Sequence, residues 1–252
     1  MIKRFNRYEL KYIIPVATRD AVLEELLLHV DPDREGDKNG VYKVTSLYYD
    51  TPDLQFYRSK LDGIKYRRKV RIRQYGEFTT EPDPRVMIEI KQRINRTTQK
   101  RRLALKRSEA YALCAGELAR QFEDRGDAAV ASEVEYLVKT LFLKPSCLVG
   151  YVRRAFMGRA YEPGLRVTFD ELLWCGTPAM GLTDAVPHHS IMELSHVVME
   201  VKANDAVPLW LSLLLARKDC ALDRFSKYCA GVARLLAGED RYLIAPTGAI
   251  HG

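Results

Sequence analysis

The chain has 252 residues, of which 47% are hydrophobic, and this length and composition predict a folded globular protein and exclude wholesale disorder. A formal net charge of +7, from 40 Lys and Arg against 33 Asp and Glu, favours anionic ligands without naming one. The five cysteines are scattered and no C-x-x-C occurs, which argues against a disulfide framework or a zinc ribbon.

The hydrophobic stretches predict a cytoplasmic protein. The basic, alternating segment Met1 to Lys11 lacks the apolar run of a signal peptide. The most apolar stretch, Val207 to Ala216, is about half the length needed to cross a bilayer, so we expect a buried helix there. Reduced, unpaired thiols also fit the cytoplasm.

The first half of the chain is dominated by period-two alternation, which is typical of strands with two different faces. One helix is expected among these strands. In chain order the predicted elements are a strand over 7–12, a helix over 18–30, and strands over 44–50, 64–75, 86–93 and 98–106.

The second half alternates helices and strands. Ser108 and Asp127 are the expected N-caps of its first two helices. In chain order the predicted elements are helices over 108–123 and 127–143, strands over 148–157 and 165–173, a loop over 175–187, a strand over 196–203, and helices over 208–218 and 224–236.

Many antiparallel strands with inserted helices predict an α+β protein with a barrel or a strongly curved sheet. No linker divides the sequence, so we expect one domain over residues 1–238 and a loosely held tail over 239–252.

Three predicted strands carry the same short pattern, Glu-x-Lys. Because side chains alternate along a strand, each Glu and its Lys share a face. The pairs are Glu9 with Lys11, Glu89 with Lys91, and Glu200 with Lys202. Other charged residues fall on these or similar faces: Lys69, Arg71, Arg73, Arg93, Lys100, Arg102, Arg153, Arg166 and Asp170.

This mixture of charges suits a phosphate chain. Arg offers a planar fork to phosphoryl oxygens, and carboxylates can hold a divalent cation that bridges them. The alternative is that the charges form the solvated face of an ordinary antiparallel sheet. Against that reading, the face is rich in Arg, and Glu always lies two residues before Lys.

In sequence order, these motifs resemble the VTC domain, the polyphosphate polymerase domain of the vacuolar transporter chaperone complex. The resemblance covers residues 4 to 236, and no single motif carries it alone. The matching segments are RFNRYELKY (4–12), SLYYDT (46–51), KVRIRQYG (69–76), IEIK (88–91), YVRRAF (151–156), LRVTFD (165–170), MEVK (199–202) and FSKY (225–228).

The resemblance implies a triphosphate tunnel metalloenzyme: an eight-stranded antiparallel β-barrel around a hydrophilic tunnel, with flanking helices. The implied activity is transfer of the γ-phosphoryl group of ATP to growing inorganic polyphosphate, with Mn²⁺ or Mg²⁺. The implied phosphate ligands in the tunnel are Lys11, Arg71, Arg73, Lys91, Arg153 and Arg166; further substrate contacts are Lys69, Lys202, Ser226 and Lys227; the metal carboxylates are Glu200 first, then Glu89, Glu9 and Asp170.

Two other functions stay open at this stage. A metal-dependent triphosphatase would use the same residues but release phosphate to water, and a non-catalytic polyanion- or RNA-binding module would use only the basic face. The Glu-x-Lys pairs do not fit the binding module, so no nucleic acid partner is expected. We expect ATP, polyphosphate and phosphate as ligands. Eukaryotic members add a regulatory domain and a membrane segment, so a membrane-protein partner and a peripheral location at the inner membrane face are further expectations.

Overall fold

A computed structural model describes residues 7–76, 81–95, 97–182 and 189–238. Its residues form two compact units, which are described separately below. Unit 1 comprises Met1–Lys43, Tyr151–Leu173 and Ser190–Ser226; unit 2 comprises Val44–Gly150, Trp174–His189 and Lys227–Gly252. The predicted tail, 239–252, lies outside the described residues.

Eight strands form one hydrogen-bonded path, in the order β1-β10-β8-β7-β3-β4-β5-β6. Their bounds are β1 Arg7–Pro15, β3 Val41–Asp50, β4 Tyr66–Tyr75, β5 Arg85–Ile94, β6 Thr97–Lys106, β7 Lys144–Gly158, β8 Arg166–Gly176 and β10 His196–Asn204. Two short strands lie off the path: β2 (Val30–Pro32) pairs with β7, and β9 (His189–Ser190) with β8. The assigned registers are all antiparallel, and the α+β class with an eight-stranded antiparallel sheet and flanking helices is confirmed.

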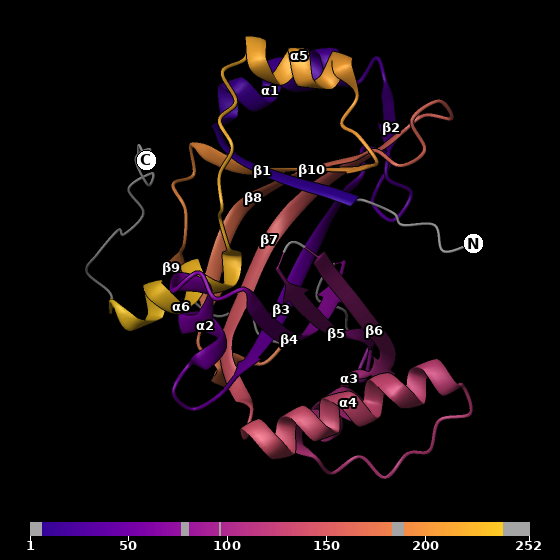
Figure 1. The fold of residues 1–252 in the computed structure, drawn as a ribbon, viewed down its shortest axis with the longest axis vertical. Coiled ribbons are helices and arrows are strands. Elements are labelled where there is room, and N and C mark those ends of the chain that lie inside the picture. Colours follow the sequence, from indigo (N-terminus) through magenta and orange to yellow (C-terminus); the bar gives the residue numbers. More distant parts are fainter. Residues whose placement is uncertain (1–6, 77–80, 96, 183–188, 239–252) are drawn as a thin grey trace. The chain divides into compact units, whose positions relative to one another are not determined.

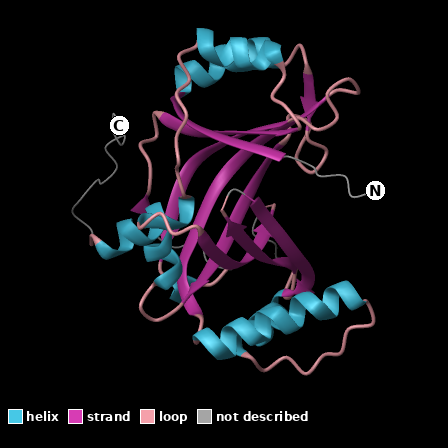
Figure 2. Ribbon diagram, in the orientation of Figure 1, coloured by secondary structure: helices cyan, strands magenta, loops and turns pink. Residues whose placement is uncertain are grey.

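Six α-helices and one short 3₁₀ helix accompany the strands in the described residues. They are α1 Val16–Leu26, α2 Gln55–Leu61, α3 Arg107–Ala115, α4 Arg125–Leu141, α5 Leu209–Arg217, α6 Lys227–Leu236 and the 3₁₀ helix Pro178–Met180. Figure 2 separates these helices from the strands by colour. The sequence did not predict α2, β2 or β9.

In unit 1, one face of the strands β1, β10 and β8 forms the core. Ile14, Val167, Phe169 and Met199 are fully or almost fully buried there. Helices α1 and α5 pack together over β1 and β10, as Figure 1 shows. The residues that alternate with these apolar side chains therefore point to the opposite face, where the Glu-x-Lys pairs of β1 and β10 lie.

Unit 2 likewise has strands with one apolar face in the core and one charged face opposite. Val70, Ile72, Ile88 and Ile90 of β4 and β5 are completely buried, and they share a core with residues of α3 and α4. Helix α3 contacts β5 and β6, and α4 contacts β6. The predicted alternation in these strands is confirmed, since the apolar residues line the core and the basic ones, except Arg68, lie on the other face.

Several helix boundaries differ from the prediction. The first helix ends at Leu26 rather than at Val30, because Val30 pairs with Gly158 in β2. The helix predicted over 108–123 ends at Ala115, because Gly116 adopts φ = 78° and closes it. The last helix begins at Lys227, three residues after the predicted start.

Both predicted N-caps are wrong. Helix α3 begins at Arg107, and its N-cap is Lys106. The Glu109 carboxylate accepts the backbone N–H of Lys106 at 3.0 Å, whereas Ser108 donates from its backbone N–H and its hydroxyl to the Asp83 carboxylate. In α4 the N-cap is Asp124, whose carboxylate accepts the N–H of Asp127 at 2.8 Å. Candidate capping residues lie too close together for the sequence to rank them.

Other differences concern the middle and the end of the chain. Strand β7 begins at Lys144, earlier than predicted, and runs through Pro145. Cys175 and Gly176, expected in a loop, complete β8, while residues 183–187 of that loop lie outside the described residues.

Helix α5, which was expected to be buried, has two different faces. Leu211, Leu214 and Leu215 are buried, whereas Leu209 and Leu213 are exposed. No helix within the described ranges has the length and apolarity that a membrane crossing requires. The five cysteines lie within the described residues, and none of them is joined in a disulfide.

The corrected cap of α4 can be tested by stability. We expect Asp124→Ala to lower the free energy of unfolding by about 1 kcal/mol, because the N–H of Asp127 loses its acceptor. Asp127→Ala is the matched control and should cost less, since it removes only a favourable charge from the first turn. Urea unfolding measures both, and a larger loss in Asp127→Ala would contradict the assignment.

Candidate functional site

Unit 2 carries a group of charged side chains centred on Glu89, on the face opposite its core. Glu89 of β5 lies directly across from Arg71 of β4 and Arg102 of β6, and Tyr48 of β3 lies across from Arg71. Paired residues of antiparallel strands project from the same face, so one face of four strands supplies the group. We call Tyr48, Arg71, Arg73, Glu89 and Lys100 the Glu89 cluster.

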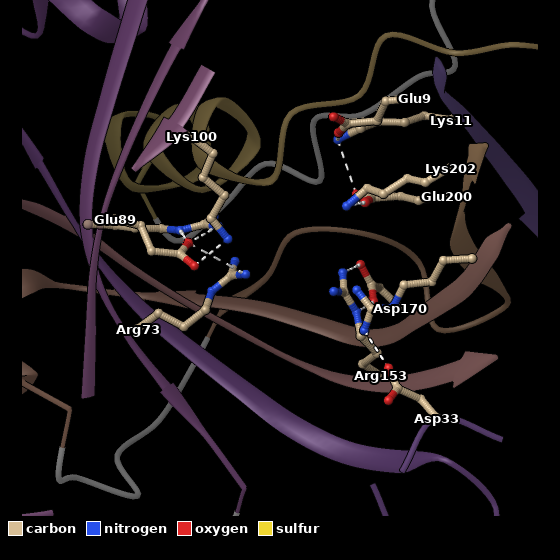
Figure 3. Close-up of polar contacts among 12 residues, drawn as sticks. Glu9, Lys11, Asp33, Arg73, Glu89, Lys100, Arg153, Asp170, Glu200 and Lys202 are labelled. Carbon is tan, nitrogen blue, oxygen red and sulfur yellow. Dashed lines mark hydrogen bonds and ion pairs between the residues drawn. The ribbon is translucent and has the colours of Figure 1, made fainter. Parts of the chain in front are cut away.

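Arg71 is fixed from two sides within this cluster. Its Nε and Nη2 donate to Oε2 of Glu89 at 2.8 and 2.5 Å, and its Nη1 donates to the Tyr48 hydroxyl at 2.8 Å. Lys100 forms an ion pair with Oε1 of Glu89, and Nη1 of Arg73 lies 3.9 Å from Oε2 (Figure 3). These hydrogen bonds thus fix the orientation of the Arg71 guanidinium without a ligand.

These cations change the protonation of the groups they surround. Burial would raise the pKa of Glu89, which is 1% exposed, but Arg71, Arg73 and Lys100 hold it well below its usual range. Burial would also raise the pKa of Tyr48, yet Arg71, Arg73 and Lys69 lower it to about 8. Glu89 is therefore a carboxylate at any physiological pH, and Tyr48 loses its proton more readily than an ordinary tyrosine.

The other predicted residues of unit 2 lie around this cluster. Arg73 donates from Nε to the Ser46 hydroxyl at 3.1 Å. Lys91 lies on the same face, across from Lys69 and Lys100. Lys69 lies 5.6 Å from the ring centre of Tyr228, which stacks on Tyr48 with ring centres 4.8 Å apart. Lys227 is a buried residue that begins α6.

Unit 1 carries a second group, centred on Glu200. The Glu-x-Lys pairs of β1 and β10 run in opposite directions, so Lys11 lies across from Glu200, and Glu9 across from Lys202. Lys11 Nζ is 3.1 Å from Glu200 and 3.8 Å from Glu9, and Lys202 Nζ is 3.7 Å from Glu200 (Figure 3). We call these four residues the Glu200 cluster.

Two arginines of unit 1 are held by carboxylates. Arg153 donates from Nε and Nη2 to the two oxygens of Asp170, at 2.6 and 2.8 Å, and both side chains are buried. Burial alone would lower the pKa of Arg153, but Asp170 raises it well above its usual value. Arg166 donates to Asp33 at 2.7 Å and to the Tyr42 hydroxyl at 2.8 Å.

Ser226, the last predicted residue of unit 1, is partly buried and immediately precedes α6. All fourteen predicted site residues are therefore described. The structure brings twelve of them together within the units: seven lie on or beside the charged face of unit 1 and five on that of unit 2. Lys227 begins α6, and Ser226 immediately precedes it.

The charge balance of the two groups differs. In unit 1 the carboxylates of Glu9, Asp33, Asp170 and Glu200 match four cations: Lys11, Arg153, Arg166 and Lys202. In unit 2 Glu89 shares its face of β4, β5 and β6 with a surplus of cations, including Lys69, Arg71, Arg73, Lys91, Lys100 and Arg102. The face in unit 2 is consequently suited to an anion, while the face in unit 1 is locally neutral.

The four predicted metal carboxylates differ in their suitability. Asp170 and Glu89 already accept hydrogen bonds from Arg153 and Arg71. Glu9 and Glu200 share the ammonium of Lys11, so a divalent cation is attracted to the same place. Within the described residues no three His, Cys, Asp or Glu are grouped as a metal site. A pair of carboxylates nonetheless fits Mg²⁺ or Mn²⁺, which take few protein ligands alongside phosphate oxygens and water.

Sequence reasoning missed several contributors to these groups. Asp33 and Tyr42 lie far from their partner Arg166 in the sequence. Tyr48 carries no charge, so the charge pattern passes over it; it is buried, and its hydroxyl contacts Arg71. Alternation could have found Ser46 and Tyr48, because these two residues occupy one face of a strand that was correctly predicted.

The fold and the two clusters together define an α+β protein whose antiparallel strands present preorganised cations and buried carboxylates. The sequence profile of the VTC domain matches residues 6–236. The chain belongs to the VTC domain family, as its motifs predicted.

Two curated relatives are similar to the chain. Both are named vacuolar transporter chaperone complex subunit 4: one from Trypanosoma brucei brucei is 23% identical over 92% of this chain, and one from Trypanosoma cruzi is 25% identical over 76%. The aligned part makes up 34% and 28% of those proteins, so the chain spans about a third of their length.

The fold also has a counterpart among solved structures. A crystal structure of a candidate adenylate cyclase from Bacillus halodurans superposes with a TM-score of 0.50, covering 86% of this chain and 92% of that one. The two sequences are only 12% identical, so the comparison shows a similar fold and nothing more.

The buried ion pairs of Glu89 make stability depend on pH. At pH 7 we expect Glu89→Gln to lower the free energy of unfolding by about 3 kcal/mol, because Arg71 and Lys100 lose their counter-charge. The folded state depresses the pKa of Glu89, so its contribution is complete above the ordinary carboxyl pKa of about 4.3 and declines as the pH falls below that value.

Urea unfolding of both proteins at pH 7 and near pH 3 measures this effect, and the difference between them should shrink at the lower pH. Glu135→Gln serves as the control: it breaks a surface pair with Lys139 and should cost about 0.5 kcal/mol or less. A difference that does not change with pH would show that the charge of Glu89 is not what stabilises the fold.

Ionisation of Tyr48 can be followed directly. We expect a tyrosinate absorbance step near pH 8 that is absent from Tyr48→Phe. Added tripolyphosphate should move the step to higher pH, because an anion offsets the cations that lower the pKa. By linkage, tripolyphosphate should bind more weakly above pH 8. A step unaffected by tripolyphosphate would place the anion elsewhere; Tyr136→Phe, at an exposed tyrosine of α4, is the control.

Proposed function

We propose that this protein is a polyphosphate polymerase that transfers the γ-phosphoryl group of ATP to a growing inorganic polyphosphate chain. The observation that carries the proposal is the cation-rich face of unit 2, where the buried carboxylate of Glu89 orients Arg71, in a chain of the VTC domain family. The names of the two curated relatives support the same substrate class.

The cations of unit 2 would bind the non-bridging oxygens of the phosphate chain. Arg71 suits this role because Glu89 and Tyr48 already hold its guanidinium, so little conformational entropy is lost on binding. Lys69, Arg73 and Lys91 share the face and add charge-assisted hydrogen bonds. Fixed donors of this kind stabilise the charge that develops on phosphoryl oxygens during transfer.

The residues of unit 1 would bind phosphate differently, because their charges are balanced. Arg153 and Arg166 are held by Asp170 and Asp33 and would donate to phosphoryl oxygens from fixed positions. Glu200 and Glu9 would hold Mn²⁺ or Mg²⁺, with Asp170 and Glu89 serving as counter-charges for arginines. Such a cation, when bound, supplies charge neutralisation to the phosphate oxygens.

The proposed reaction needs no strong general base from the chain. The attacking group is the terminal phosphate of polyphosphate, whose oxygen is already anionic at neutral pH. Catalysis then depends mainly on positioning the reactants and neutralising their charge, as is usual in phosphoryl transfer. Lys202, Ser226 and Lys227 are proposed as additional substrate contacts.

Replacing Arg71 tests this assignment. With ATP, Mn²⁺ and a polyphosphate primer, we expect Arg71→Ala to lower turnover by about 100-fold or more, because one preorganised donor to the transferred phosphoryl group is lost. Arg101→Ala is the matched control: Arg101 lies on β6 of the same unit, forms an ion pair with Glu133, and should leave turnover nearly unchanged.

The products decide between the rival functions. ADP, free phosphate and polymer are measured together in the same reaction. ADP with polymer supports the polymerase, whereas free phosphate without polymer would identify a triphosphatase. Salt-dependent binding of tripolyphosphate without any turnover would identify a polyanion-binding module. Turnover in Arg71→Ala equal to that of the control would contradict the role given to Arg71.

A further inference from the structure

Thr168 of β8 has a hydroxyl group that the fold does not satisfy. The residue is 1% exposed, and its Oγ1 has no hydrogen-bond partner among the described residues. Buried hydroxyl groups are normally paired, because an unpaired one has lost its bonds to water without replacement. An unpaired buried hydroxyl therefore marks a place for a bound water molecule or another ligand.

The position of Thr168 favours a ligand. Its neighbours in sequence, Val167 and Phe169, are buried in the apolar core of unit 1, so Thr168 projects from the opposite, charged face. In the sheet it lies directly across from Glu200, and Glu200 lies directly across from Lys11. Three adjacent strands thus place the hydroxyl, the carboxylate and the ammonium in one row.

The neighbouring charges indicate the kind of ligand. On its own strand Thr168 lies between Arg166 and Asp170, which share its face and are paired with Asp33 and Arg153. Beside it on β10 is the carboxylate of Glu200, 7% exposed. A phosphate oxygen placed directly between Thr168 and Glu200 would face a carboxylate, whereas a divalent cation would be attracted by both oxygen atoms.

We propose that the hydroxyl oxygen of Thr168, together with the carboxylate of Glu200, binds the divalent cation. The inference rests on the proposed function, and it adds a neutral ligand to the carboxylates already considered. Carboxylate and hydroxyl oxygens are hard donors of the kind that Mg²⁺ and Mn²⁺ select. A neutral third donor also avoids adding another negative charge to a face that must accept phosphate.

The charge pattern of the sequence could not identify this residue. Threonine carries no charge, and in LRVTFD it occupies an alternating position that an ordinary strand fills equally well. It is also not one of the His, Cys, Asp and Glu residues by which a metal site is usually recognised in a sequence. Only the register between β8 and β10 places it beside Glu200.

Two substitutions at Thr168 test the proposal. Thr168→Val keeps the shape and removes the oxygen, while Thr168→Ser keeps the oxygen. Binding of Mn²⁺ to the full chain, without nucleotide, is measured by the electron paramagnetic resonance signal of free Mn²⁺. We expect Thr168→Val to bind Mn²⁺ about tenfold more weakly and Thr168→Ser to bind nearly as well as wild type. Thr140→Val, on the exposed face of α4, is the matched control.

The melting temperature without metal distinguishes a ligand from a structural hydroxyl. We expect Thr168→Val to melt at or above the wild-type temperature, because an unpaired buried hydroxyl is removed. A clear loss of stability in metal-free Thr168→Val, or unchanged Mn²⁺ binding, would overturn the proposal. If the wild type makes no polymer but binds Mn²⁺ in a Thr168-dependent way, the proposed function fails and this inference stands.

Discussion

A buried carboxylate needs partners that compensate its charge, and in both charged groups of this protein those partners are cations that the fold holds beside it. Glu89 is almost completely enclosed, yet Arg71 and Lys100 keep it charged. Asp170 is bound at both oxygens by Arg153. Removing either partner would leave a buried charge without compensation, so the pairs fix the positions of the guanidinium groups as well as their ionisation.

The same interaction has different consequences in the two units. In unit 2 Glu89 lies among a surplus of cations, and their combined positive charge attracts an anion. In unit 1 each cation is paired with a carboxylate, so the electrostatic attraction for a phosphate group is weaker there unless a metal ion accompanies the phosphate. This contrast leads to the division proposed here, with direct phosphate binding in unit 2 and metal-assisted binding in unit 1.

Strand geometry lets one short segment serve the core and the site together. In β8, Val167 and Phe169 pack into the core of unit 1, while Arg166, Thr168 and Asp170 face the charged side. A change in register by one residue would exchange the two sets, and the fold would lose its core as well as its site. The apolar alternation therefore stabilises the placement of the charged residues.

The sequence determined which residues share a face, because alternation along a strand depends on neighbours alone. The Glu-x-Lys pairs and the placement of Arg71 and Ile72 on opposite faces of β4 were accordingly predictable, as was membership of the VTC domain family. The sequence did not determine which residues meet across strands. The pairings of Arg166 with Asp33 and of Thr168 with Glu200 depend on strand order and register, which are set by packing between distant segments. For the same reason, whether a carboxylate faces a guanidinium was decided only by the tertiary structure.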